Sequence, residues 1–132
     1  MFLCDTNIIS ELSRSKPNQV VIDWVDRIDI LTISVITVEE IYFGLAAKPN
    51  PRITAWWENL LTSGCEILPV TTEIAEYTGN IRGSYRTKGQ VRHQADMLIA
   101  ATAKIHHLTV VTRNTKDFEG CGIAIFNPFD SI

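Results

Sequence analysis

Residues 1–10 read "MFLCDTNIIS", a short apolar run that ends at an aspartate and then passes into a helical pattern. A brief run of this kind is typical of a buried strand, and Asp5 stands where the strand gives way to a helix. A carboxylate at a helix start accepts hydrogen bonds from unpaired backbone N–H groups, so capping is the simplest interpretation of Asp5. The ends of parallel strands are also where ligands bind, which makes Asp5 a candidate site residue.

Short apolar runs continue to alternate with longer helical patterns along the chain. Each run is brief, as expected of strands covered on both faces, and the five are Phe2–Cys4, Ile30–Val35, Ile67–Val70, Thr109–Thr112 and Ile123–Phe126. The segment "DMLIAATAKI" (96–105) is apolar almost all round, which predicts a helix packed deep in the molecule. We therefore predict an α/β fold, a three-layer α/β/α sandwich with a short central parallel sheet. At 132 residues, we expect a single domain over 1–132.

The composition argues against several classes of protein. Apolar residues make up 45% and charged residues 20%, which is typical of a globular chain rather than a disordered one. No apolar stretch approaches the roughly 20 residues that span a bilayer, and no basic segment precedes the first apolar run. Three widely spaced cysteines, Cys4, Cys65 and Cys121, argue against a disulfide scaffold or a zinc site. We expect a cytoplasmic protein that does not enter a membrane.

Basic residues are concentrated in one part of the chain, although the net charge is −3. No acid occurs between Glu76 and Asp96, and four of the twelve Lys and Arg residues lie there, here called the basic segment: Arg82, Arg86, Lys88 and Arg92. Such a segment is either a solvated helix face or an approach for phosphate groups. Its position directly before Asp96 keeps both interpretations open.

Acidic residues follow three of the predicted strands. Asp5 follows the first, Glu39 and Glu40 the second, and Asp117 the fourth, while Asp96 begins the internal helix. Because the carboxyl ends of parallel strands meet at one sheet edge, these acids should converge. Like charges that share a site raise a pKa or require a cation, and carboxylate oxygens are the ligands that Mg²⁺ prefers.

Each acid has a simpler explanation when it is taken alone. Thr37 and Glu40 have the spacing of a capping box, in which two residues cap a helix start reciprocally. Asn114 and Asp117 repeat that spacing. A cage of carboxylates around one or two divalent ions can instead activate water and stabilise charge at a phosphodiester phosphorus. Both interpretations stay open for each residue, and the expected convergence favours metal binding.

Four stretches resemble the PIN-domain ribonucleases, and within them the VapC-type toxins of bacterial toxin–antitoxin pairs. They are "LCDTNIISEL" (3–12), "ISVITVEEIYFG" (33–44), "ADMLIAATA" (95–103) and "VVTRNTKDFEGCGIAIFNPF" (110–129). The Asp-Thr-Asn opening alone would be a weak signal. Four motifs in order, at family-like spacing over the whole chain, make the resemblance specific.

The resemblance implies a Mg²⁺-dependent endoribonuclease, with Mn²⁺ able to substitute. Carried over by position, the catalytic and metal-binding acids are Asp5, Glu40, Asp96 and Asp117. Glu40 matches rather than Glu39 because the family's glutamate precedes a glycine by four residues, here Gly44. Some members place the last acid where Asn114 stands, so that residue is an alternative to Asp117. Thr6 and Thr112 match positions that orient ligands or water.

The resemblance also implies partners. VapC-type toxins cleave RNA, form homodimers and are inhibited by a small antitoxin whose C-terminal segment lies across the active groove. The basic segment is then expected to bind the RNA backbone. Trp56 and Trp57 are either an exposed apolar patch for dimerisation or the core side of an amphipathic helix.

Two other functions remain open from the sequence. A receiver-type phosphoacceptor module also gathers acids around Mg²⁺, but it needs an aspartate at the end of its third strand, where this chain reads "ILPVTT" (67–72). A PIN-like domain that binds RNA or a partner without cleaving would have lost one or more acids. All four acids are present, so cleavage is the leading hypothesis.

Overall fold

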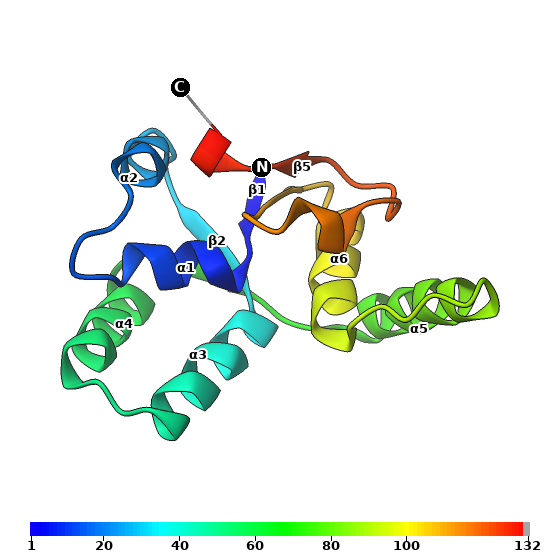
Figure 1. The fold of residues 1–132 in the computed structure, drawn as a ribbon, viewed down its shortest axis with the longest axis horizontal. Helices are drawn as coiled ribbons and strands as arrows, with labels where there is room; N and C mark the ends of the chain where they lie inside the picture. The colour runs from blue at the N-terminus through cyan, green and yellow to red at the C-terminus, as the bar shows by residue number, and fades with distance from the viewer. Residues whose placement is uncertain (131–132) are drawn as a thin grey trace.

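The computed structural model describes residues 1–130 and places short parallel strands between two groups of helices (Figure 1). The strands are β1 (Phe2–Cys4), β2 (Leu31–Ser34), β3 (Cys65–Leu68), β4 (Thr109–Val111) and β5 (Ile125–Phe126). The helices are α1 (Thr6–Leu12), α2 (Gln19–Asp26), α3 (Val35–Ala47), α4 (Pro51–Ser63), α5 (Thr72–Thr87) and α6 (Gln94–His106). Two 3-10 turns follow β4 and β5, η1 (Thr115–Phe118) and η2 (Pro128–Asp130).

The strands form two parallel ladders that meet at the centre of the molecule. β1 pairs with β4 and β4 with β5, while β2 pairs with β3. β1 and β2 lie side by side, so the strand order across the molecule is β5-β4-β1-β2-β3 (Figure 1). The predicted parallel sheet is therefore confirmed, with its carboxyl ends at one edge.

The third strand differs from the prediction. β3 spans Cys65–Leu68 rather than Ile67–Val70, because Pro69 lacks the N–H needed to extend the ladder. It is also an edge strand whose Ile67 is 39% exposed, so the prediction that both of its faces are covered is wrong. The predicted strand Ile123–Phe126 shortens to its last two residues in β5.

Two cores lie on opposite faces of the sheet, because consecutive strand residues point to opposite sides. Cys4 and Val111 belong to a core that also contains Trp57 and side chains of α1 and α2. Leu3 and Val110 belong to a second core with side chains of α6 and η1. Figure 1 shows α1 to α4 on one side of the strands and α5 and α6 on the other. The predicted three-layer sandwich is confirmed.

The helix predicted to be internal is α6. Six of its residues are buried, and it packs against α5, β4 and η1. In the part of the chain that the structure describes, no helix has the length and apolar character needed to cross a membrane. The buried side chains of α6 instead pack in the second core, against one face of the sheet.

The start of α3 differs from the capping prediction. β2 passes directly into α3, and the Oγ of Ser34 accepts a hydrogen bond from the backbone N–H two residues ahead. Thr37 lies inside the helix and is fully buried. The predicted capping box of Thr37 with Glu40 is therefore wrong, because the helix begins three residues earlier than that pair requires.

The two adjacent tryptophans of α4 have different environments. Trp57 is fully buried, and its ring meets that of Tyr42 edge-on with centroids 6.1 Å apart. Trp56 is half-buried and packs against the same core. The core interpretation of this pair is confirmed, and among the helices it is α3 that carries exposed large apolar side chains, of which Phe43 is 69% exposed.

This difference predicts unequal contributions to stability. Trp57→Ala should lower the free energy of unfolding by about 3–5 kcal/mol, because it leaves a large cavity in the core. Trp56→Ala, the matched control, should lower it by roughly half as much or less, because part of that side chain already meets water. Urea unfolding followed by circular dichroism measures both. Equal losses would contradict the assignment of Trp57 to the core.

Candidate acidic metal site

A pocket of about 510 Å³ opens at the carboxyl edge of the sheet. Three of the predicted acids, Asp5, Glu40 and Asp96, line it together with Asn114. They come from the ends of β1 and β4 and from α3 and α6, elements that are far apart in the sequence. The structure thus brings Asp5 and Glu40 together, as strand order predicted, and α6 brings Asp96 beside them, whereas Asp117, the third acid expected from strand order, does not line the pocket.

Asp5 caps a helix and also anchors a wider network. Its Oδ1 accepts a hydrogen bond from the backbone N–H of Thr6 at 2.8 Å. Its Oδ2 accepts from Thr112 Oγ1 at 2.8 Å and from Asn7 Nδ2 at 3.0 Å. A carboxylate offers about four lone-pair positions, so these bonds leave capacity for one more partner. Burial raises the pKa of Asp5, the Thr112 and Thr6 hydrogen bonds lower it, and Glu40 and Asp117 raise it.

Glu40 is held in the pocket by a pair of threonines. Thr6 Oγ1 donates to Glu40 Oε1 at 2.6 Å and lies 3.0 Å from Thr37 Oγ1. Because a hydroxyl has one hydrogen, Thr37 is then the donor in the second contact. Glu39 is exposed and does not line the pocket. The geometry thus separates two neighbouring glutamates that helical spacing left equivalent.

Asp96 stands in the first turn of α6 and lies close enough to the other acids for their charges to act on its pKa. Its pKa rises from 3.8 to about 6 through burial and through the charges of Asp5 and Asp117. His93 acts in the opposite direction, and Glu40 adds a smaller upward contribution. A half-buried carboxyl shifted by neighbouring carboxylates is the electrostatic signature of acids that share one site.

Asp117 lies at the rim rather than inside. It is exposed in η1 and does not line the pocket, although its charge acts on both Asp5 and Asp96. Asn114 lines the pocket, and its backbone N–H donates to Thr112 Oγ1 at 3.0 Å. No side-chain hydrogen bond caps η1, so the predicted capping pair of Asn114 with Asp117 is wrong.

Comparison with known proteins identifies the chain. Residues 2–120 match the family model of the PIN domain. VapC ribonuclease Y4jK of Sinorhizobium fredii is 36% identical over 98% of this chain and 99% of the relative. Toxin FitB of Neisseria gonorrhoeae is 38% identical over 98% of this chain and 99% of its own. The crystal structure of FitAcB from Neisseria gonorrhoeae superposes with a TM-score of 0.85 at 39% identity, covering 98% and 99% of the two chains.

The chain belongs to the PIN-domain family, in its VapC-type branch. PIN-domain nucleases of this type use a divalent cation, and the pocket offers suitable donors, which are carboxylate, amide and hydroxyl oxygens without Cys or His. Among residues 1–130, no three Asp, Glu, His or Cys side chains lie close enough to hold one ion directly. A hard cation that keeps several of its waters and takes one or two carboxylates fits this spacing.

The receiver-type alternative is not supported, because β3 is an edge strand and ends at Leu68 without an acid.

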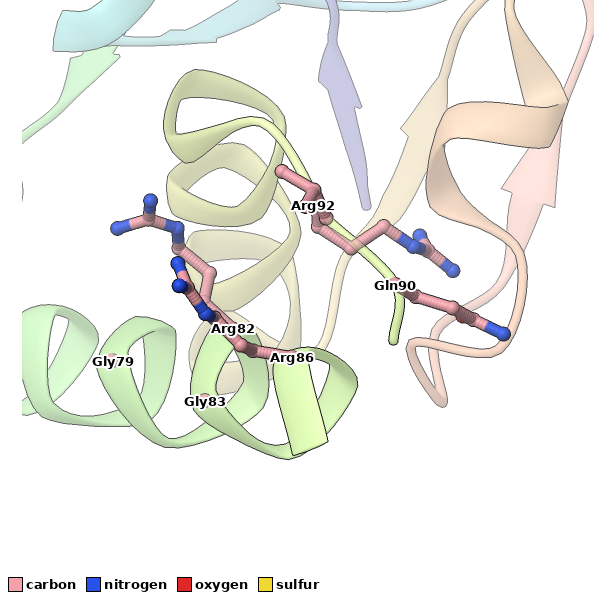
Figure 2. Close-up of a pocket in the computed structure, with 7 residues that line it drawn as sticks. Gly79, Arg82, Gly83, Arg86, Gln90 and Arg92 are labelled. Atoms are coloured by element: carbon pink, nitrogen blue, oxygen red, sulfur yellow. The ribbon is translucent and has the colours of Figure 1, made fainter. Parts of the chain in front are cut away.

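The basic segment of this PIN domain does not form one surface. Arg82, Arg86 and Arg92 line a second pocket of about 210 Å³ on the C-terminal half of α5. Figure 2 shows the side chains of Arg82 and Arg86 extending together on one side, whereas Arg92 points away from them. The Nε of Arg82 is buried without a hydrogen-bond partner. Lys88 is exposed at the end of α5, with its Nζ 5.8 Å from the centre of the Tyr85 ring.

Several residues of the site were missed or misassigned from the sequence, among them Asn7 and Thr37, and the pocket is also lined by Ser10, Glu11 and Arg14. Asn7 bridges the strand ends, since its Nδ2 contacts Asp5 and lies 3.2 Å from Thr112 Oγ1, while its Oδ1 accepts from the backbone N–H of Arg113. It stands in the quoted Asp-Thr-Asn motif, which was the signal available. Thr37 was assigned to a cap, and only its full burial beside Thr6 shows its contact with the site.

The raised pKa of Asp96 predicts how the metal-free protein responds to pH. A carboxyl whose pKa is higher when folded contributes stability at low pH and loses it as the pH rises from about 4 through 6. Asp96→Asn should therefore stabilise the metal-free protein at neutral pH by on the order of 1 kcal/mol, allowing for solvent screening of this half-exposed group. The gain should shrink toward about pH 4, where the wild-type carboxyl is protonated.

Denaturant unfolding with chelator present, at the two pH values, measures this difference. Asp29→Asn is the matched control, because Asp29 is exposed and outside the pocket lined by the acids. A variant that is less stable than wild type at neutral pH, or whose gain does not change with pH, would contradict the shared-site assignment.

Proposed function

We propose that this protein is a toxin of a toxin–antitoxin pair and acts as a divalent-metal-dependent endoribonuclease, a hydrolase that cuts RNA phosphodiester bonds. The observation that carries the proposal is the convergence of Asp5, Glu40 and Asp96 in one pocket, where burial and the neighbouring acids raise the pKa of Asp96. The name of the Sinorhizobium fredii relative, a VapC ribonuclease, and that of toxin FitB agree with it. We take 1–132 as one catalytic domain that works in the cytoplasm.

Asp5, Glu40 and Asp96 are the residues proposed to hold Mg²⁺, for which Mn²⁺ substitutes, one or two of them binding it directly and the others through its bound waters. Asp117 or Asn114 would complete the site. A bound cation would supply Lewis-acid activation of water and neutralise charge developing on the phosphate. The protein's own groups do the rest. Thr112 and Thr6 hold Asp5 and Glu40 in place through the hydrogen bonds described above. Asp96 or Asp117 orients the attacking water by accepting its hydrogen bond.

The proposed RNA path runs from the pocket toward the C-terminal half of α5. Arg82 and Arg86 extend side by side there and offer guanidinium donors to phosphate oxygens (Figure 2). Lys88 adds an exposed positive charge nearby. The guanidinium group of Arg92 is engaged by backbone carbonyl oxygens, so it is not part of this set.

The proposed partners are a second copy of the chain and a small antitoxin that lies across the open pocket. The exposed apolar side chains of α3, Tyr42 and Phe43, lie on the helix that carries Glu40 and offer a surface for such contacts. An antitoxin seated there would cover the acids and block access of RNA. In a host cell, expression of the chain should stop growth and the antitoxin should restore it.

The first test compares the two adjacent glutamates. Purified protein should cleave RNA with Mg²⁺ or Mn²⁺ and stop when EDTA is added. Glu40→Gln should lower cleavage by about 100-fold or more, because it removes a charged ligand. Glu39→Gln, its exposed neighbour, should cleave like wild type. Gel analysis of RNA fragments under single-turnover conditions measures the rates.

The outcome that supports the non-cleaving alternative is distinct. RNA affinity that falls with salt, with no cleavage in any divalent metal, would identify a binding domain and overturn the proposed nuclease. Equal decreases in the cleavage rate of Glu39→Gln and Glu40→Gln would overturn the assignment of Glu40 as the metal-binding glutamate, while the nuclease activity itself would stand.

A second test addresses the RNA path. Arg82→Ala and Arg86→Ala should each weaken RNA binding and reduce the slope of log affinity against log salt by about 0.7, as expected when one contact to a single-stranded phosphate is lost. The cleavage rate at saturating RNA should change little. Arg27→Ala, which removes an exposed positive charge at the end of α2, is the control. Unchanged slopes in both variants would place the RNA elsewhere.

A further inference from the structure

We propose that Arg92 is a positioning residue that locks residues 117–121 onto α5 and thereby fixes Asp117 at the rim of the acidic pocket. The sequence predicted a phosphate contact for this side chain, but its contacts are with the protein itself. The consequence for cleavage depends on the proposed function. The structural part of the proposal, that Arg92 clamps residues 117–121, does not depend on the proposed function.

The guanidinium group of Arg92 donates to two backbone carbonyls. Nη1 donates to the carbonyl oxygen of Asp117 at 3.1 Å, and Nη2 donates to that of Glu119. Carbonyls at the end of a short helical turn lack partners within the turn, so they need donors from elsewhere. The planar fork of arginine supplies two at once, which a lysine ammonium group cannot do in the same geometry.

Tyr85 forms the other side of the clamp. The guanidinium carbon of Arg92 lies 4.2 Å from the centre of the Tyr85 ring, and Tyr85 Oη is 3.5 Å from the carbonyl oxygen of Glu119. Gly120 makes this approach possible. Its φ of +78° favours glycine, and a Cβ there would lie 2.6 Å from Tyr85 Oη. Residues 117–121 are therefore shaped to receive Tyr85 and Arg92.

The clamp also connects Asp117 with Asp96, which lines the pocket, because Arg92 lies just before the helix that carries Asp96. Arg92 directly precedes His93, the N-cap of α6, and Asp96 stands in the first turn of that helix. Arg92 Nη1 lies 3.7 Å from the sulfur of Cys121, which in turn is 3.8 Å from the sulfur of Met97. Movement of Arg92 would thus disturb the segment that carries Asp117 and the start of α6 together.

No acid neutralises this arginine in the described part of the chain, where Arg14 with Glu11 is the one ion pair. Its partners are neutral carbonyls, so the role depends on the shape of the fork and on ring stacking. Charge alone cannot replace it. This separates the clamp from a phosphate contact, which a lysine would largely preserve.

The test compares Arg92→Lys and Arg92→Ala with Lys116→Ala, which removes an exposed positive charge from η1 without touching the clamp. Amide hydrogen exchange in the metal-free protein reports on residues 117–121. Both Arg92 variants should exchange there about 10-fold faster or more, since a loop that loses its tertiary contacts opens more readily. Lys116→Ala should exchange like wild type. Circular dichroism shows whether each variant folds, and if Arg92→Ala does not fold, the test uses Arg92→Lys alone.

Metal affinity and kinetics supply the second readout. Mn²⁺ binding followed by electron paramagnetic resonance, without RNA, should weaken by about 10-fold or more in both Arg92 variants, as for other residues that orient metal ligands. The cleavage rate constant should fall similarly, with KM and the salt slope unchanged. The clamp would be overturned in favour of a phosphate contact if Arg92→Lys had the metal affinity and cleavage rate of wild type while the salt dependence of RNA affinity decreased in Arg92→Ala.

The two proposals can fail separately. If wild-type protein binds RNA but cleaves none, the nuclease proposal is wrong, and hydrogen exchange still tests whether Arg92 clamps residues 117–121. If wild type cleaves and residues 117–121 exchange equally in all variants, the clamp falls and the nuclease stands.

Discussion

The hydrogen bonds around Asp5 join the parts of the molecule on which the site depends. One carboxylate accepts from the first turn of α1, from Asn7 and from Thr112, which follows β4. It thereby ties the ends of β1 and β4, which are neighbours in the larger ladder, to α1, the helix that follows β1. The hydrogen bond by which Asp5 caps α1 also holds its carboxylate in position at the pocket. A buried carboxylate is stable here because each bond comes from an oriented donor.

The same arrangement has an electrostatic cost that the fold does not remove. Asp5, Glu40 and Asp96 face one pocket, and burial, together with the charges of the neighbouring acids, raises the pKa of Asp96 to about 6. Such strain is typical of functional sites, where stability is reduced to keep reactive groups together. If the protein binds a divalent cation as proposed, the cation would relieve the repulsion between these acids, and metal binding would then increase stability.

Most of the architecture could be predicted from local patterns, because strand and helix periodicity depend on neighbouring residues. The predictions were wrong at positions where a local sequence pattern is compatible with two different structures. Thr37 has the spacing of a cap but lies one turn inside α3, because β2 runs into that helix without a loop. Ile67–Val70 has the composition of a strand, yet Pro69 stops the ladder after Leu68.

The sequence by itself determined the fold class and the family and supplied a set of candidate acids, because strand-helix order and motif spacing are properties of the chain. Only the tertiary structure decided which of those residues meet. It placed Glu40 rather than Glu39 beside Thr6, left Asp117 at the rim, and turned Arg92 away from Arg82 and Arg86 toward residues 117–121. Side-chain direction depends on packing between elements distant in the chain, and no local pattern records it.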